Sequence, residues 1–143
     1  MRNIILTILL LFSQQVLCFA EPAAKAVQKG NQLYKEKKYD EAIKNYNKAQ
    51  ISMPDSDIIN FDTGAALYKK GDYEKAAASF TKGLTTEDPA LESKSNYNIG
   101  NSKYRQAELK ENTELEVAAA LCRQALDYYK RAIELNGKDK DAK

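Results

Sequence analysis

Two stretches of the chain share one pattern of apolar and polar positions, offset by 34 residues. Residues 30–49 read GNQLYKEKKYDEAIKNYNKA, and residues 64–83 read GAALYKKGDYEKAAASFTKG. In each stretch, apolar or small residues recur at helical spacing on both sides of a polar break, at residues 37–38 and 71–72. The pattern therefore predicts two helices joined by a tight turn in each stretch.

The positions that match between the two copies are mostly small or aromatic. Small residues let two helix backbones approach closely, and an aromatic ring then fills the space between neighbouring hairpins. We therefore interpret the small residues and the rings of Tyr39, Tyr73, Tyr46 and Phe80 as structural packing positions. The matched pairs are Gly30 with Gly64, Leu33 with Leu67, Tyr34 with Tyr68, Tyr39 with Tyr73, Ala42 with Ala76, and Tyr46 with Phe80.

A third copy of the pattern is longer than the first two. Its glycine and alanine are 25 residues apart (125 minus 100), where the first copy has 12 (42 minus 30). The additional residues lie within RQAELKENTELEVAAAL and favour helix, so we expect both helices of the third hairpin to be longer. Thr113 and Glu116 have the spacing of a capping box, which predicts that the last helix begins at Glu114.

With this period and with Gly30, Ala42, Tyr46, Ala49 and Pro54 in the first copy, the chain resembles the tetratricopeptide repeat family. The family's tryptophan is absent, and its places are held by Ala26, Asn60 and Asn96. The resemblance implies an all-α fold, a right-handed solenoid of about three helix-turn-helix hairpins, the third with lengthened helices. The repeats would cover about residues 23–56, 57–90 and 93–136, within a domain of residues 21–137 that a polar tail of residues 138–143 follows.

The long third hairpin and the ending ALDYYKRAIELNGKDKDAK also resemble a group of short secreted bacterial repeat proteins. These are encoded beside von Willebrand A-domain membrane proteins in aerotolerance (Bat) gene clusters. The resemblance implies a periplasmic protein that assembles with a membrane-tethered A-domain partner. Self-association is a further possibility.

The first 20 residues, MRNIILTILLLFSQQVLCFA, have the pattern of a secretory signal peptide. Arg2 precedes an apolar run, and the small residues Cys18 and Ala20 flank Phe19 just before Glu21. We therefore expect cleavage after Ala20 and export across the inner membrane to the bacterial periplasm. An uncleaved membrane anchor is the alternative, although the apolar run is shorter than the roughly 20 residues that span a bilayer.

The composition argues against several classes of function. The sequence contains no histidine and, after removal of the signal peptide, one cysteine, Cys122, which excludes a His-based triad or a Cys/His zinc site. It has no phosphate-binding glycine-rich loop. A net charge of +2 without a basic block argues against a nucleic-acid partner. We therefore expect a non-enzymatic protein without cofactor, metal or small-molecule substrate.

The family resemblance implies a concave groove, lined by the first helix of each hairpin, that holds a segment of a protein partner. Tyr-Lys, Tyr-Lys and Tyr-Arg recur on this face, which suits a segment with apolar side chains and carboxylates. In the alternative interpretation the charges are solvated and the tyrosines only pack between repeats. The groove positions are Asn31, Tyr34, Lys35, Phe61, Tyr68, Lys69, Lys94, Tyr97, Asn101, Tyr104 and Arg105.

One known version of this groove clamps a C-terminal carboxylate with lysine, asparagine and arginine side chains. Asn31 and Lys94 fit that version. Val27, Asp62 and Asn98, however, take the places of a lysine, an asparagine and an arginine. The sequence therefore does not predict binding of a chaperone tail.

The last helix carries a wider apolar arc than a surface helix needs. We expect one stripe of it to pack inward: Leu115, Ala119, Cys122, Leu126, Tyr129 and Ile133. On the adjoining face we expect a docking face of Leu121, Tyr128 and Leu135, with at least Tyr128 and Leu135 uncovered. This leads to the alternative function, a structural assembly subunit of a membrane-associated complex that uses the third hairpin and the last helix.

Overall fold

The computed structural model describes residues 22–141, with side chains described as far as residue 137. The expected signal peptide and the alternative anchor, residues 1–20, lie outside the described residues. The described chain is helical throughout, which confirms the all-α fold class. A first helix of residues 22–35 is followed by α2 (Tyr39–Ser52), α3 (Asp57–Lys70), α4 (Tyr73–Lys82), the 3₁₀ turn η1 (Gly83–Thr85), α5 (Pro89–Lys110) and α6 (Leu115–Asp141).

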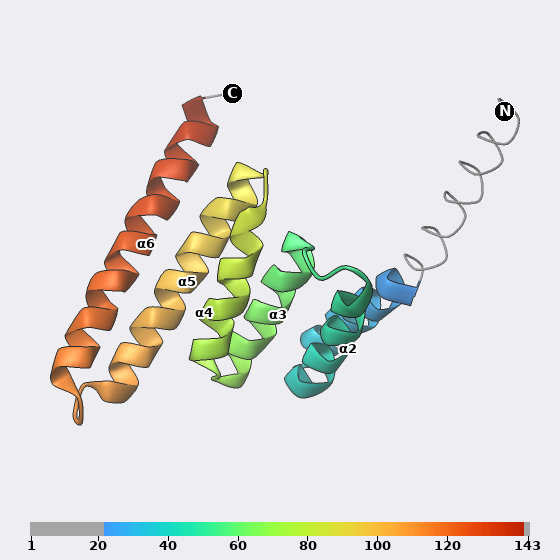
Figure 1. Cartoon of the computed structure of the whole chain (residues 1–143), viewed down its shortest axis with the longest axis horizontal. Coiled ribbons are helices and arrows are strands. Elements are labelled where there is room, and N and C mark those ends of the chain that lie inside the picture. Colours follow the sequence, from blue (N-terminus) through green and yellow to red (C-terminus); the bar gives the residue numbers. More distant parts are fainter. Residues whose placement is uncertain (1–21, 142–143) are drawn as a thin grey trace, which may run out of the picture.

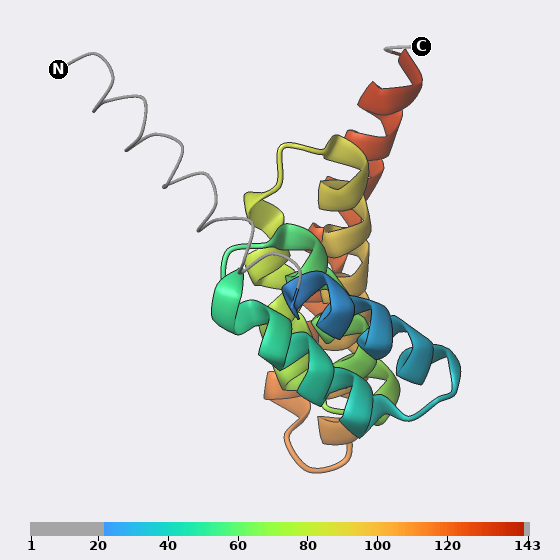
Figure 2. The same cartoon turned by 90° about the vertical axis from the view of Figure 1, so that its right-hand side faces the viewer.

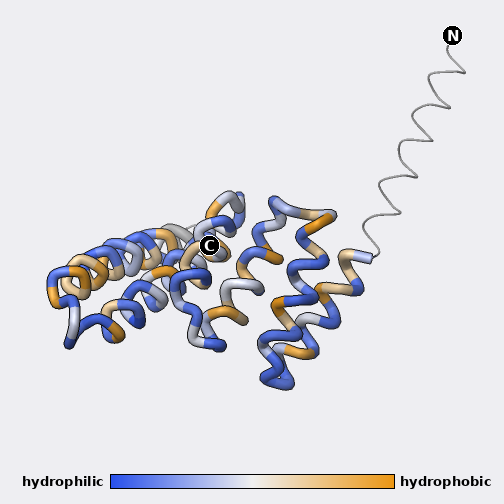
Figure 3. Tube along the Cα trace, turned by 60° about the horizontal axis from the view of Figure 1, so that its bottom comes forward, coloured by the Kyte–Doolittle hydropathy of each residue, from blue (hydrophilic) through white to orange (hydrophobic). Residues whose placement is uncertain are grey.

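The helices form three hairpins that stack side by side (Figure 1). The first helix pairs with α2, α3 pairs with α4, and α5 pairs with α6, and contacts between α2 and α3 and between α4 and α5 join neighbouring hairpins. The view in Figure 2 shows the first hairpin at the end of the stack nearest the viewer. Figure 3 shows hydrophobic positions on every hairpin, so the core extends along the stack.

The hairpins are held at short range by one contact that occurs three times. A Cβ atom added to Gly30 would lie 2.5 Å from the ring of Tyr46, and one added to Gly64 would lie 2.8 Å from the ring of Phe80. In the third hairpin, a Cβ on Gly100 would lie 2.6 Å from the ring of Tyr129. Glycine therefore allows a close approach at these positions, as expected, although the contact joins a backbone to an aromatic ring of the same hairpin and not two backbones.

The turns within the first two hairpins form at the predicted breaks. Gly71 ends α3 with a φ of 92°, a left-handed conformation that glycine adopts without strain. Asp72 then caps α4, because its side chain accepts a hydrogen bond from the backbone of Lys75. Lys37 takes the place of Gly71 in the first hairpin and has a φ of 61°. The first turn therefore keeps the same backbone shape at a cost in strain that glycine would not incur.

The core lies between hairpins as much as within them. One buried cluster joins Tyr46 of α2 to Ile59 and Ala66 of α3, and a second joins Phe80 of α4 to Ile99 of α5. At one of the places of the missing family tryptophan, buried Asn60 accepts a hydrogen bond of 2.8 Å from Gln50 of α2. An amide pair therefore connects the first two hairpins where the family uses a large ring.

The third hairpin is longer than the others, as expected. Helix α5 has 22 residues and α6 has 27, compared with 14 each for α2 and α3 and 10 for α4. Helix α6 begins at Leu115, one residue after the expected start. It also continues to Asp141, through residues that we expected to form a polar tail. Extension of an existing helix adds one backbone hydrogen bond per residue, so it does not require an apolar face.

The prediction of which face of α6 packs inward was wrong. The buried positions are Ala118, Ala125, Ala132 and Leu135, and Leu135 is only 6% exposed. Tyr128 is partly buried against the second core cluster, so Tyr128 and Leu135 do not form an uncovered docking face. The cause is the close approach that small side chains allow, which turns the alanine face toward α5, roughly 100° from the expected face at 100° per residue.

The stripe that we expected inside α6 is largely outside. Leu115 is 73% exposed, Leu126 is 56% exposed and Ile133 is 72% exposed, and the Cys122 thiol is also exposed. Leu126 follows Ala125 in the same way that Ile43 follows Ala42 and Ala77 follows Ala76. Ile43 and Ala77 are covered, and Ile43 packs against both core clusters. The equivalent face of α6, which carries Leu126, is exposed within the described chain.

Substitution of Gly64 tests the contact between the rings and the glycines. Gly64→Ala places a Cβ against the buried Phe80 ring, so we expect it to lower the free energy of unfolding by about 1–3 kcal/mol. Gly137→Ala is the matched control, because no atom lies within 4 Å of its added Cβ. This control should raise stability by up to about 1 kcal/mol. Urea denaturation followed by circular dichroism measures both, and equal effects of the two substitutions would contradict the proposed packing.

Candidate functional site

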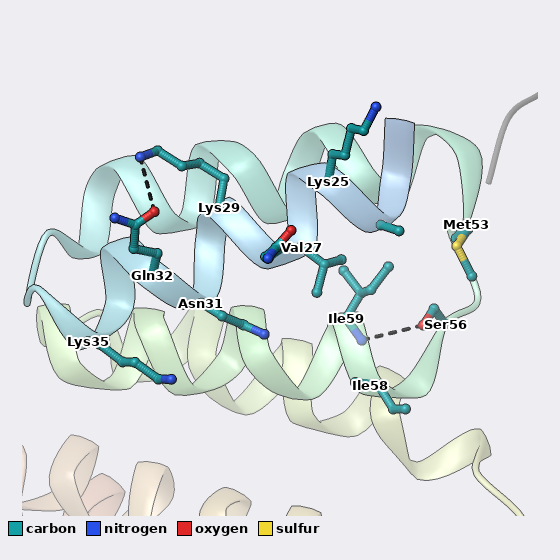
Figure 4. A pocket seen from close by; sticks show the side chains of 12 residues that line it. Lys25, Val27, Lys29, Asn31, Gln32, Lys35, Met53, Ser56, Ile58 and Ile59 are labelled. Atoms are coloured by element: carbon teal, nitrogen blue, oxygen red, sulfur yellow. Dashed lines mark hydrogen bonds between the residues drawn. The ribbon is translucent and has the colours of Figure 1, made fainter. Parts of the chain in front are cut away.

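A large open groove lies on the first two hairpins, between the first helix and the start of α3 (Figure 4). Its volume is about 1180 Å³. Val27 of the first helix and Ile59 of α3 lie next to each other at its floor, and Ile58 and Met53 lie at one end (Figure 4). Ile58 and Met53 are exposed, so this end of the groove offers apolar surface to a ligand.

Three lysines of the first helix also line the groove. They are Lys25, Lys29 and Lys35. The Lys29 ammonium donates a hydrogen bond of 3.4 Å to Gln32, and Lys35 is exposed. The groove therefore combines an apolar floor with a positively charged rim, an arrangement that favours a segment with apolar side chains and carboxylates.

A second, smaller pocket continues the groove toward the middle of α3. Its volume is about 380 Å³, and it shares Asn31 and Lys35 with the larger groove. Asn31 is held in place because the Tyr46 hydroxyl donates a hydrogen bond of 2.7 Å to its amide oxygen. The residues that line this pocket are Asn31, Tyr34, Lys35, Tyr46, Phe61, Asp62 and Ala65.

Asp62 gives the smaller pocket a negative charge. Its carboxylate is half-buried and makes no hydrogen bond or ion pair with the described residues. Burial raises the pKa of Asp62, because the charged form is less well solvated there. Burial also raises the pKa of Tyr34 and of Tyr46, and the nearby charge of Asp62 adds to both shifts. The carboxylate therefore lies close to two phenol groups without bonding to them.

The expected groove residues of α5 are occupied by contacts within the chain. The Arg105 guanidinium donates a hydrogen bond of 2.7 Å to Glu108 and lies over the Tyr73 ring, 5.4 Å from its centroid. The Asn101 amide oxygen accepts a hydrogen bond of 2.9 Å from Tyr129. These contacts leave Arg105 and Asn101 less available to a ligand than their positions suggested.

The other expected residues divide between the pockets and the open surface. Asn31, Tyr34, Lys35 and Phe61 line one or both pockets. Lys69, Lys94, Tyr97 and Tyr104 are exposed, Tyr68 packs edge-on against Tyr73, and Tyr97 lies against Tyr129 with ring centroids 5.7 Å apart.

Sequence reasoning missed part of the site. The sequence pattern identified Asp62 only as a departure from the carboxylate clamp, and it did not identify Ile58. Ile58 occupies the position in the second repeat that Lys94 occupies in the third. The repeat alignment could have found Ile58. Lys25, Lys29 and Met53 gave no such signal, because they lie outside the groove positions that the repeat alignment assigns.

Within residues 22–141, no group of three or more acidic, histidine or cysteine side chains is placed to hold a metal ion. Among the same residues, no helix combines the length and the apolar content needed to span a bilayer.

Comparisons with known proteins agree with the repeat architecture. Residues 27–92 match the family model described as tetratricopeptide repeat. Heat shock protein STI1 of Saccharomyces cerevisiae is 35% identical over 97 residues, which is 64% of this chain and 16% of that protein. The chain thus spans about a sixth of the length of this curated relative.

Two solved structures have similar folds. The first repeat domain of Spaghetti (RPAP3), bound to the HSP90 peptide SRMEEVD, has a TM-score of 0.56 at 20% identity, over 86% of this chain and 94% of that one. The TPR2AB domain of yeast Sti1 in complex with a pHSP90 peptide has a TM-score of 0.54 at 27% identity, over 82% and 48%. Together with the family match, these likenesses support the tetratricopeptide repeat assignment and suggest a protein–protein interaction module.

The pKa of Asp62 leads to a prediction about stability. Because the folded protein holds this proton to a higher pH than the unfolded chain, the folded state loses stability as the pH rises through the raised pKa. Asp62→Asn removes this loss, so we expect a higher melting temperature at pH 7 and a gain that shrinks below about pH 4. Asp55→Asn, in the exposed turn before α3, is the control and should change little. Thermal unfolding across pH measures both, and a lower melting temperature for Asp62→Asn would contradict the unpaired carboxylate.

Proposed function

We propose that this protein is a non-enzymatic interaction module that holds an extended segment of a partner protein in the groove of its first two hairpins. The observation that carries the proposal is the continuous groove between the first helix and α3, with its apolar floor and lysine rim. A segment with alternating apolar and acidic side chains fits this lining, because each apolar side chain would bury surface and each carboxylate would approach a lysine.

The proposed partner segment differs from the HSP90 peptide SRMEEVD that one of the two similar structures binds. SRMEEVD ends in a carboxylate. In this chain, a terminal carboxylate near Asn31 would meet Asp62 in the same pocket. Val27 also contributes no charge where the carboxylate clamp has a lysine. Repulsion and the missing cation both disfavour such a tail, so we infer an internal segment of the partner as the ligand.

The proposed location is the cell envelope, on the strength of the signal-peptide pattern in residues 1–20. A membrane-tethered von Willebrand A-domain protein is the partner that the gene-cluster resemblance suggests. N-terminal sequencing of the protein from envelope fractions is expected to begin at Glu21. A start at Met1 would instead support the uncleaved anchor.

The exposed face of α6 favours a second candidate function, that of an assembly subunit. In the first two hairpins the equivalent face packs against the first helix of the next hairpin, which runs antiparallel to it. By continuity with these two interfaces, the occupant would be an amphipathic helix of a partner protein, antiparallel to α6 and in contact with Leu126 and Ile133. The groove would then be empty in the complex.

Two double variants separate the candidates. Lys35→Glu with Ile58→Glu changes the groove, and Leu126→Glu with Ile133→Glu changes α6, in each case at exposed side chains that the fold does not need. If the groove binds the partner, the first variant should weaken co-purification from native envelope at least about tenfold, or 1.4 kcal/mol, while the second keeps it. The reverse result would support assembly through α6. Circular dichroism of both variants controls for folding.

A further inference from the structure

We propose that Asp62, with the rings of Tyr34 and Phe61, forms a subsite for one basic side chain, lysine or arginine, of the bound segment. The inference rests on the proposed groove function and adds a second recognition element to it. The lysine rim selects acidic side chains, and the smaller pocket selects a cation a short distance further along the same groove.

Asp62 has no counter-ion among the described residues. Two other carboxylates with shifted pKa values, Glu36 and Asp72, each form a 2.7 Å ion pair, with Lys38 and Lys75 respectively, and the pKa of each is lowered. Asp62 is less exposed, has no such partner among the described residues, and has a pKa shifted in the opposite direction. A cation brought by a ligand would supply the missing interaction.

Aromatic side chains line the smaller pocket together with Asp62. They belong to Tyr34, Tyr46 and Phe61. An ammonium or guanidinium group is attracted to aromatic faces as well as to a carboxylate. The chain already contains one such contact, in which Arg105 lies over the Tyr73 ring and also binds Glu108. The smaller pocket offers the same two partners, a ring and a carboxylate, without a cation between them.

The size and position of the smaller pocket also suit a single basic side chain. At about 380 Å³, the pocket is near the lower end of the roughly 300–1,000 Å³ typical of ligand sites, which suits one long side chain better than a folded ligand. Lys35 also lines the pocket, but its ammonium forms no ion pair with Asp62. Lys35 is exposed and lines both the groove and the smaller pocket. A basic side chain of a segment in the groove would therefore pass beside Lys35 to reach the Asp62 carboxylate.

The test is a selection of random twelve-residue peptides, displayed on phage, on the wild-type protein and on Asp62→Asn. Peptides selected on the wild type should carry lysine or arginine at one fixed position, and those selected on Asp62→Asn should not. For a selected synthetic peptide, Asp62→Asn should weaken binding at least tenfold, and replacement of its lysine by norleucine should do the same. The two changes together should cost little more than either alone, because they remove one shared interaction.

Controls distinguish the subsite from a general effect of charge. Asp55→Asn removes the same charge outside the groove and should leave affinity unchanged. Binding of the selected peptide should also weaken as the pH falls, as Asp62 becomes protonated. The higher melting temperature expected for Asp62→Asn shows that its weaker binding does not come from misfolding.

Several outcomes would overturn the subsite. One is a set of selected peptides without a basic position, and another is full affinity of a lysine peptide for Asp62→Asn. Carboxylate-dependent binding of SRMEEVD that Asp62→Asn leaves unchanged would also count against it. In each case the groove function still stands if Lys35→Glu with Ile58→Glu abolishes peptide binding. If that double variant binds the selected peptides as the wild type does, the groove function fails as well.

Discussion

The contact between an aromatic ring and a glycine on the facing helix sets the spacing of every hairpin, and it also shapes the groove. In the first hairpin the ring belongs to Tyr46, and its hydroxyl extends past Gly30 to hold Asn31. The third hairpin repeats the arrangement with a tyrosine and an asparagine. In the second, Phe80 has no hydroxyl, and Ala65 stands where the others have asparagine. The core residue and the groove residue therefore differ together in the second hairpin, because the asparagine is present only where the ring has a hydroxyl to bind it.

The hairpins and their turns could be predicted because they depend on local patterns that the repeat states more than once. The face of α6 could not be predicted from hydrophobicity, because Leu115, Leu126 and Ile133 are exposed whereas small residues such as Ala125 and Ala132 are buried. Ala125 and Ala132 occupy the places of Ala42 and Ala49, which are fully buried, so the repeat alignment contained the correct answer. Apolar periodicity identifies a helix and its amphipathic character, whereas steric fit between backbones decides which stripe faces the neighbour.

The groove was predicted in outline, and its chemistry only in part. The sequence predicts a tyrosine and a cation at equivalent groove positions of all three repeats. Arg105, however, lies over the ring of Tyr73 in the preceding hairpin, so the three repeats do not present the same surface. Such contacts depend on how one hairpin tilts against the next, and no local pattern records that tilt. The same limit applies to Asp62, whose role becomes visible only when Tyr34 of the first hairpin lies beside it.

The Asp62 carboxylate has no partner among the described residues, and aromatic rings line the same pocket. Because burial weakens the hydration of its ionised form and raises its pKa, we expect that form to lower the stability of the folded protein at neutral pH. Within this chain, asparagine at Asn31 shows that an amide is compatible with the groove, and asparagine at the Asp62 position would avoid the loss of hydration. Residues that reduce stability in an open pocket are characteristic of binding sites, where the ligand supplies what the fold lacks. Lys25 and Lys29 line only the larger groove, and Asp62 lines only the smaller pocket. This separation of charge would then fix the direction in which a segment binds, because a segment with its acidic and basic residues in reverse order would meet like charges.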